Sequence, residues 1–268
     1  GSVGYRRLHR LCEAGYRHRM IRPTSHIGRG GGRYPDEFML TVKGGDALQE
    51  AFDIADDTLT TFRVRPRSSF TTNHSAEIGA VYAALRTKIE SMDGLSMQDW
   101  QSDHITARSY DQVIVARHGT EGSMERVQLP IVPDGTFTLL HPKGQVRVFV
   151  EVDRGTRRVE TWRDKIYAYK TYVGSPELKA RYGVDTFILL SIAPTKIQRR
   201  RLMNATAAVL GEASNRYLFC LQESVHPLRI GGEWLKISGV SRTRMPIGLK
   251  GSPIEKVTAS TVEHVFLQ

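Results

Sequence analysis

The spacing of apolar residues changes between helical and strand-like several times after residue 73. Apolar positions recur at helical spacing in stretches that predict helices, namely residues 73–92, 156–173 and 195–210. Alternating or continuous apolar runs predict strands, namely residues 112–117, 136–141, 146–152, 184–193 and 216–222. Residues 94–110 have no clear period. Strands interrupted by helices predict the α/β (α+β) class, with a mixed sheet covered by helices on both faces.

The first 62 residues follow another pattern. Apolar residues on one side of residues 3–14 predict a short amphipathic helix that ends at Gly15. A strand, a basic glycine-rich turn, a second strand and the start of a helix follow. This order predicts the back half of a winged helix-turn-helix, although the earlier helices of such a domain have no counterpart here. We expect a partial winged-helix domain over residues 1–62, a second domain over residues 63–268, and a linker over residues 53–72.

The overall charge favours a polyanionic partner. The formal net charge is +10 and the isoelectric point is near 9.7, so double-stranded DNA is the expected partner. Recognition helices place basic side chains in the major groove, and a wing contacts the backbone or the minor groove. The predicted DNA contacts are Arg6, Arg7, Arg10, Arg17, Arg29, Arg33 and Arg154.

Localisation is predicted from what the sequence contains. No apolar run is long enough to span a membrane and no secretory signal opens the chain. Cys12 and Cys220 lie far apart, without metal-binding spacing, and suit a reducing interior. We therefore expect a cytoplasmic protein without a membrane partner. A homodimer and contacts with further proteins are left open.

Three carboxylates lie in or beside the predicted hairpin of residues 136–152. Glu151 and Asp153 are two residues apart on one strand, so they point to the same face. The turn at Pro142 and Gly144 folds the strands back and brings Asp134 close to Glu151. Like charges brought together need compensation. A divalent cation, Mg²⁺ or Mn²⁺, supplies it through oxygen ligands.

The proline–aspartate pair, the hairpin and the acid-x-acid triplet, with a helix on either side, resemble the PD-(D/E)xK nuclease fold. The resemblance implies that Asp134 and Glu151 bind the metal and that a lysine assists the attacking water. Asp153 stands at the usual lysine position, which is a departure from the family pattern. Lys165 on the following helix is the candidate for a migrated lysine, and Glu77 on the first helix matches an additional metal ligand.

Five motifs in the same order resemble the replication-relaxation family. They are "RRLHRLCEAGY", "NHSAEIG", "VPDGTF", "FVEVDRGT" and "KIYAYKTY", and the likeness covers roughly residues 5–190. The resemblance implies winged-helix DNA binding joined to a nuclease-like domain. It also implies a role in plasmid replication, DNA relaxation or conjugative transfer, and it leaves contacts with other replication or mobilisation proteins open.

Each candidate residue also has a structural interpretation. Asp134 in a Pro-Asp-Gly sequence fits an ordinary turn, and Asp153 fits the N-cap of a helix that begins near Thr156. Glu151 needs a partner among apolar neighbours, which a salt bridge to Arg154, Arg157 or Lys165 would supply. Glu77 fits a solvated helix position.

Two functions follow from these alternatives. The first is a metal-dependent DNA endonuclease or nickase, with Asp134, Glu151, Asp153 and Lys165 as catalytic residues. The second is a DNA-binding accessory or regulatory protein whose nuclease fold no longer cleaves. The missing lysine of the triplet favours the second function, whereas the three clustered acids favour the first.

Overall fold

The computed structural model describes residues 3–20, 37–52, 69–118, 124–211, 214–226, 230, 234–237 and 256–257. The chain divides into two compact units, residues 1–76 and residues 77–268, and each is described by itself. The expected boundary between residues 62 and 63 falls outside the described residues, so it stays a prediction.

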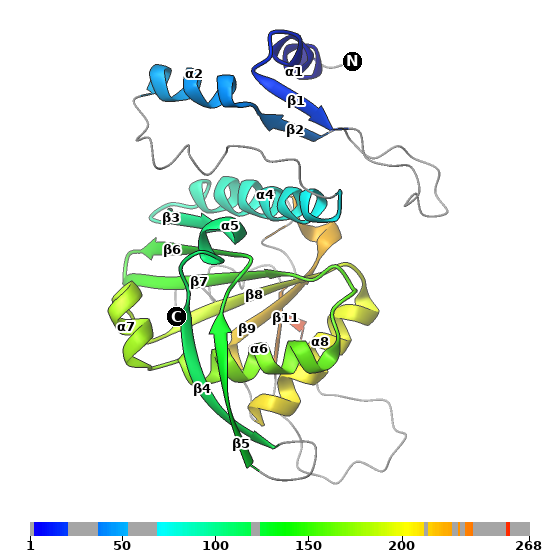
Figure 1. Cartoon of the computed structure of the whole chain (residues 1–268). Coiled ribbons are helices and arrows are strands. Elements are labelled where there is room, and N and C mark those ends of the chain that lie inside the picture. The colour runs from blue at the N-terminus through cyan, green and yellow to red at the C-terminus, as the bar shows by residue number, and fades with distance from the viewer. Residues whose placement is uncertain are drawn as a thin grey trace. The chain divides into compact units, whose positions relative to one another are not determined.

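The first unit has the expected order of elements (Figure 1). They are α1 (Val3–Glu13), β1 (Arg17–Met20), β2 (Glu37–Leu40) and α2 (Val42–Phe52). β1 and β2 pair antiparallel. The predicted wing tip with Arg29 and Arg33 lies outside the described residues, so the winged-helix assignment stays a prediction.

Hydrogen bonds at the end of α1 and at the start of α2 connect the elements of this unit. Gly15 has φ +77°, and its N–H donates to the Cys12 carbonyl at 2.9 Å. Tyr16 N–H donates to the Leu11 carbonyl at 2.9 Å, which completes a Schellman motif at the end of α1. Thr41, at the start of α2, donates its hydroxyl to the Gly15 carbonyl at 2.6 Å and its N–H to the Tyr16 carbonyl at 3.1 Å. The end of α1 is therefore fixed to the start of α2.

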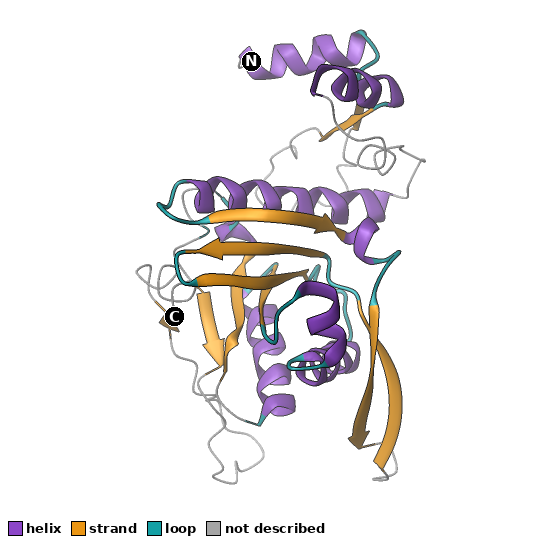
Figure 2. Ribbon diagram, turned by 90° about the vertical axis from the view of Figure 1, so that its left-hand side faces the viewer, coloured by secondary structure: helices purple, strands orange, loops and turns teal. Residues whose placement is uncertain are grey.

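The second unit is built on a sheet with strand order β11-β10-β9-β8-β7-β6-β3 (Figure 2). Its strands are β3 (Ser96–Ser102), β6 (Gly135–His141), β7 (Gly144–Val152), β8 (Phe187–Ala193), β9 (Ser214–Leu221), β10 (Trp234–Ile237) and β11 (Lys256–Val257). β7, β8 and β9 run parallel and the other pairs are antiparallel. The mixed sheet is the one that the sequence predicts.

The remaining elements flank this sheet or connect its strands. They are α4 (Ser69–Glu90), α5 (Asp103–Thr106), β4 (Asp111–His118), β5 (Met124–Ile131), α6 (Val159–Tyr172), α7 (Pro176–Tyr182), α8 (Lys196–Leu210) and a 3₁₀ turn (Gln222–Ser224). β4 and β5 form a two-stranded ribbon outside the main sheet (Figure 2). Among the described residues, no helix is long and apolar enough to cross a membrane.

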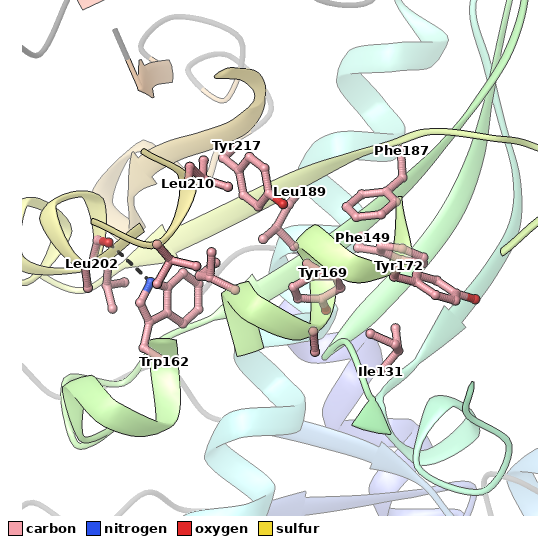
Figure 3. Close-up of a cluster of buried hydrophobic side chains, with 14 of the residues drawn as sticks. Ile131, Phe149, Trp162, Tyr169, Tyr172, Phe187, Leu189, Leu202, Leu210 and Tyr217 are labelled. Atoms are coloured by element: carbon pink, nitrogen blue, oxygen red, sulfur yellow. Dashed lines mark hydrogen bonds between the residues drawn. The ribbon is translucent and has the colours of Figure 1, made fainter. Parts of the chain in front are cut away.

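Alternation along the central strands gives the sheet a core on each face. Val150 and Leu190 point toward α4, where they pack with its buried stripe. Phe149, Phe187 and Leu189 point to the opposite face, where the aromatic side chains of α6 and the apolar side chains of α8 cover them (Figure 3). The expected helices on both faces are confirmed, and β8 is buried along its whole length.

Several local predictions are wrong. α4 begins at Ser69, four residues before the predicted start at residue 73, and so takes in the end of the predicted linker. The stretch without a clear period contains β3 and α5. β5 forms where no strand was predicted. Exposed positions alternate with partly buried ones along it. α7, between β7 and β8, was not predicted.

Two adjacent glycines at the start of α2 provide a test of the junction in the first unit. A Cβ at Gly44 would lie 2.0 Å from the Tyr16 carbonyl oxygen, whereas one at Gly45 would have no neighbour within 4 Å. We expect Gly44→Ala to destabilise this unit by at least about 2 kcal/mol, because backbone has to move. Gly45→Ala should leave it unchanged or stabilise it by up to about 1 kcal/mol. Hydrogen exchange of the α1 and α2 amides measures both, and equal protection in the two variants would contradict the junction.

Candidate functional site

Glu151 lies at the end of the central strand β7 and points toward α6. Its side chain is only 1% exposed, and Val150 and Val152 on either side point to the opposite core. A buried carboxylate is costly unless hydrogen bonds and opposite charge compensate it. The neighbours of Glu151 therefore determine what this position can do.

Three side chains donate to the Glu151 carboxylate. Lys165 Nζ, from α6, contacts both carboxylate oxygens. Tyr169 donates its hydroxyl to Oε1 at 2.8 Å, and Arg157 Nη1 donates to Oε2 at 3.2 Å. Because Lys165 and Tyr169 are four residues apart on one helix, both reach the same strand position. The expected approach of Lys165 to Glu151 is found in the structure.

The other two predicted acids lie beside Glu151. Asp134, at the start of β6, accepts a hydrogen bond from Val152 N–H at 2.8 Å through Oδ2. Asp153 is 3% exposed and accepts from Gly155 N–H at 3.1 Å through Oδ2. The N-cap of α6 is Arg158. The interpretation of Asp153 as the N-cap of this helix is therefore wrong.

Arg157 is the cation that the three acids share. Burial lowers the pKa of its guanidinium, but the negative charges of Glu151, Asp134 and Asp153 outweigh burial and raise that pKa above its ordinary value. The guanidinium is therefore held charged among the acids. We call Asp134, Glu151, Asp153, Arg157 and Lys165 the carboxylate cluster.

Tyr169 is held in its neutral form at the cluster. Burial raises the pKa of its hydroxyl well above 10, and the charge of Glu151 and the hydrogen bond to it raise that pKa further. The hydroxyl therefore remains a hydrogen-bond donor to Glu151 throughout the physiological pH range.

Three buried polar atoms near the ends of β7 and β8 have no hydrogen-bond partner among the described residues. They are Asp153 Oδ1, Ser191 Oγ and Gln198 Nε2. Ser191 is the register partner of Glu151 on β8, and Gln198 lies in the first turn of α8. Buried polar groups are normally paired, so unpaired atoms gathered beside a charged cluster indicate a place for a ligand.

The cluster fits a divalent cation only in part. Asp153 offers a carboxylate oxygen without a partner, which is the hard donor that Mg²⁺ takes. Both oxygens of Glu151 are already engaged by cations and a hydroxyl. Within the described ranges, no three or more His, Cys, Asp or Glu side chains form a group able to hold a metal.

The remaining predicted residues lie elsewhere. Arg154 Nε is 3.4 Å from Glu77 Oε2, so the expected extra metal ligand and one expected DNA contact form an ion pair. Arg6, Arg7 and Arg10 are exposed on α1, and Arg17 is half-buried on β1. These DNA-binding assignments and the metal assignment of Glu77 stay predictions.

Three further residues complete the site, and Arg157 was named from the sequence only as one of three possible salt-bridge partners of Glu151. Arg157 precedes α6 in a loop, where no period places a side chain. Tyr169 lies on the apolar stripe of α6, so it was expected to pack rather than to donate to Glu151. Ser191 interrupts an otherwise apolar strand, which is the signal that could have identified it.

The fold and the carboxylate cluster first define a class of protein. It is a two-unit α/β protein with a basic helical unit and a buried carboxylate cluster on a mixed sheet. The sequence model of the replication-relaxation family matches residues 2–188, so the chain belongs to that family. The expected family is thus confirmed, and membership supports a role in the replication or relaxation of plasmids and other mobile elements. No curated protein and no solved structure matches the chain.

The Glu151–Lys165 pair should contribute far more to stability than a surface pair. We expect Lys165→Met to lower the free energy of unfolding by about 2–4 kcal/mol, since it removes one of two cations from a buried carboxylate. Lys179→Met is the matched control, because Lys179 is 68% exposed and pairs with Asp185 at 3.3 Å. It should cost less than about 1 kcal/mol. Urea unfolding near neutral pH measures both, and equal losses would contradict the compensation of Glu151 by Lys165.

The neutral state of Tyr169 predicts a pH dependence. Below about pH 10 the hydroxyl is protonated in both states, and Tyr169→Phe should cost about 1.5–3 kcal/mol for the lost bond to a carboxylate. Above about pH 10 only the unfolded chain loses this proton, so the wild type loses stability that the variant keeps. The cost of the substitution should then shrink by roughly 1.4 kcal/mol per pH unit.

Unfolding of Tyr169→Phe and wild type at about pH 8 and about pH 11 tests this dependence. Tyr110→Phe, at an exposed side chain, is the control and should differ little from wild type at either pH. A Tyr169→Phe cost that stays constant over this range would contradict the raised pKa.

Proposed function

We propose that this protein binds double-stranded DNA and cleaves one of its phosphodiester bonds at the carboxylate cluster. The role would be to nick or cut DNA during the replication, relaxation or transfer of a mobile element. The family membership supports the setting, and the cluster supports the chemistry.

The observation that carries the proposal is the meeting of Glu151 with Lys165. The strand supplies the acid, the following helix supplies the lysine, and Asp134 and Asp153 lie beside them. The predicted nuclease motif, with its lysine moved to the helix, requires this arrangement. Asp153 Oδ1 and Ser191 Oγ are buried polar atoms without a hydrogen-bond partner among the described residues, which supports a ligand beside them.

The residues of the cluster have separate roles in this proposal. Asp153 and Asp134 would hold Mg²⁺ or Mn²⁺, which supplies a water of lowered pKa and stabilises charge on the phosphodiester when bound. Lys165 would orient the attacking water. Glu151, to which Tyr169 donates a hydrogen bond, would fix the position of Lys165. Arg157 would stabilise negative charge that develops on the phosphate oxygens.

The first unit would bring DNA to this site. Its α1 helix exposes Arg6, Arg7 and Arg10, and no carboxylate stands in the first turn. Side chains of this kind neutralise phosphates and release counterions, so binding should weaken as salt rises.

One observation favours a second function, a DNA-binding accessory protein that does not cleave. Both Glu151 oxygens are engaged by Lys165, Arg157 and Tyr169, as in a purely structural ion-pair network. In that case the cluster would only fix α6 on the sheet.

Nicking of supercoiled plasmid separates the two functions. We expect the full chain to nick in Mg²⁺ or Mn²⁺ and not in excess chelator. Asp153→Asn keeps an oxygen for Gly155 N–H but removes the charge, so it should lower the nicking rate at least about a hundredfold while DNA affinity is retained. Lys165→Met should do the same, and Lys179→Met should nick like wild type.

Circular dichroism and the DNA affinity of each variant establish that it is folded. Wild type that binds DNA but never nicks would exclude the nuclease and leave the accessory function. Nicking that survives in Asp153→Asn would place the reaction outside the carboxylate cluster. A wild-type chain that neither binds nor nicks DNA would exclude both functions.

A further inference from the structure

A pocket of about 400 Å³ lies between α6 and α8, away from the carboxylate cluster. Arg163 on α6 and Arg200 and Arg201 on α8 line it, and all three are exposed. Ile197, at the start of α8, also lines the pocket and is 83% exposed. We call these four residues the arginine pocket.

The three arginines have no anionic partner in the described part of the chain. None of them forms an ion pair or a hydrogen bond with another described residue. Surface arginines near acids usually pair with them, but α8 carries no acidic residue over its whole length. Three guanidinium groups around one pocket therefore present uncompensated positive charge to solvent.

The charge distribution along α8 is not the one that helix stability favours. All four of its cations fall within Lys196–Arg201, the first six residues of the helix. The first turn of a helix carries partial positive charge, so Lys196 and Arg199 lie where acids would be favourable, and Arg200 and Arg201 follow in the second turn. The four cations at this end of α8 lower helix stability but raise the local positive potential, and that potential favours binding of an anion.

The pocket is held by a rigid frame. Trp162 of α6 donates its indole N–H to the Leu202 carbonyl at 3.2 Å and to Thr206 Oγ1 at 3.0 Å (Figure 3). At the other end of the helix pair, Lys170 donates to the carbonyls of Val209 at 3.1 Å and Leu210 at 3.3 Å. The two helices cannot slide without breaking these bonds, so the arginines keep their spacing.

We infer that the arginine pocket binds the phosphate backbone of the DNA that the protein acts on, as a second contact separate from α1. This inference rests on the proposed function. Planar guanidinium groups match phosphate geometry, and a frame of packed helices positions them before binding. Ile197 offers an apolar contact between the charged groups, where a sugar or base edge would lie.

The position of the pocket relative to the cluster suits one DNA strand. Arg163 and Lys165 are two residues apart on α6 and project about 200° from each other, so the pocket and the cluster flank the same helix. A helix with its side chains is about 10 Å wide, and a DNA strand covers that distance in about three nucleotides. The pocket would hold a phosphate a few nucleotides from the bond at the cluster.

The family match does not assign this site. It ends at residue 188, before α8 begins at Lys196, so two of the three arginines lie beyond it. The inference comes from the geometry of this chain alone.

The test is the salt dependence of duplex DNA binding by the full chain. The pocket variant is Arg163→Gln with Arg200→Gln and Arg201→Gln. It should bind all duplex sequences more weakly, and the slope of log affinity against log salt should fall by about 1 per arginine, so by about 3. The control removes the same charge from exposed positions elsewhere on the unit, with Arg126→Gln, Lys179→Gln and Arg216→Gln. The slope of the control should change by less than about 1.

Equal losses of slope in the two variants would overturn the inference, since net charge alone would then explain both. A pocket variant that binds like wild type would also overturn it. Should the triple variant unfold on heating well below wild type, Arg200→Gln alone should still lower the slope by about 1, and an unchanged slope would count against the pocket.

A variant with substitutions in the first unit separates failure of this inference from failure of the proposed function. Arg6→Gln with Arg7→Gln and Arg10→Gln should weaken DNA binding if α1 contacts DNA. Loss in that variant with an unaffected pocket variant would overturn the pocket alone. A wild-type chain without measurable DNA affinity would overturn the pocket and the proposed function together.

Discussion

The buried carboxylate of Glu151 is the constraint on which the second unit depends. A charge that is 1% exposed is stable only with close donors, and all three donors come from α6 or from the loop before it. Their contacts fix the start of α6 over the end of β7. Trp162 of the same helix then positions α8 through hydrogen bonds to its backbone and side chains. One acid on a central strand thus determines the layer that covers this face of the sheet.

The same contacts answer why two acids share one face of a strand. The positive charges of Arg157 and Lys165 offset part of this negative charge within the chain. A purely structural network, however, would leave few buried atoms without partners. Asp153 Oδ1 and Ser191 Oγ are both buried and unpaired beside this network. This surplus of polar atoms argues that the cluster does more than hold α6 on the sheet.

The sequence predicted the elements with strong periods and missed those with weak ones. β7, β8 and α6 were predicted because apolar residues mark them clearly. The meeting of Lys165 with Glu151 was implied by the resemblance to the nuclease fold, in which Lys165 is the candidate for the migrated lysine. β3 was missed because it is a polar strand at the end of the sheet, where only one neighbour pairs with it. β5 contains Pro130, and a proline lowers the predicted strand propensity of a segment. The structure accommodates it because β4 and β5 form a two-stranded ribbon. Of the three salt-bridge partners named for Glu151 from the sequence, Arg157 and Lys165 contact it, whereas Arg154 pairs with Glu77.

The charge balance of the cluster bears on when a divalent cation would bind. The carboxylate cluster as defined from the described residues contains three acids and two cations, so its own negative charges outnumber its positive charges by one. A DNA phosphate brought beside them adds another negative charge, and the imbalance doubles. Repulsion of this size in a partly desolvated site is unfavourable unless positive charge arrives with the phosphate. The proposed cation therefore belongs to the complex with DNA more than to the free protein. This view reconciles the incomplete ligand set with the proposed cleavage, because Mg²⁺ characteristically combines one or two carboxylates with phosphate oxygens of its substrate.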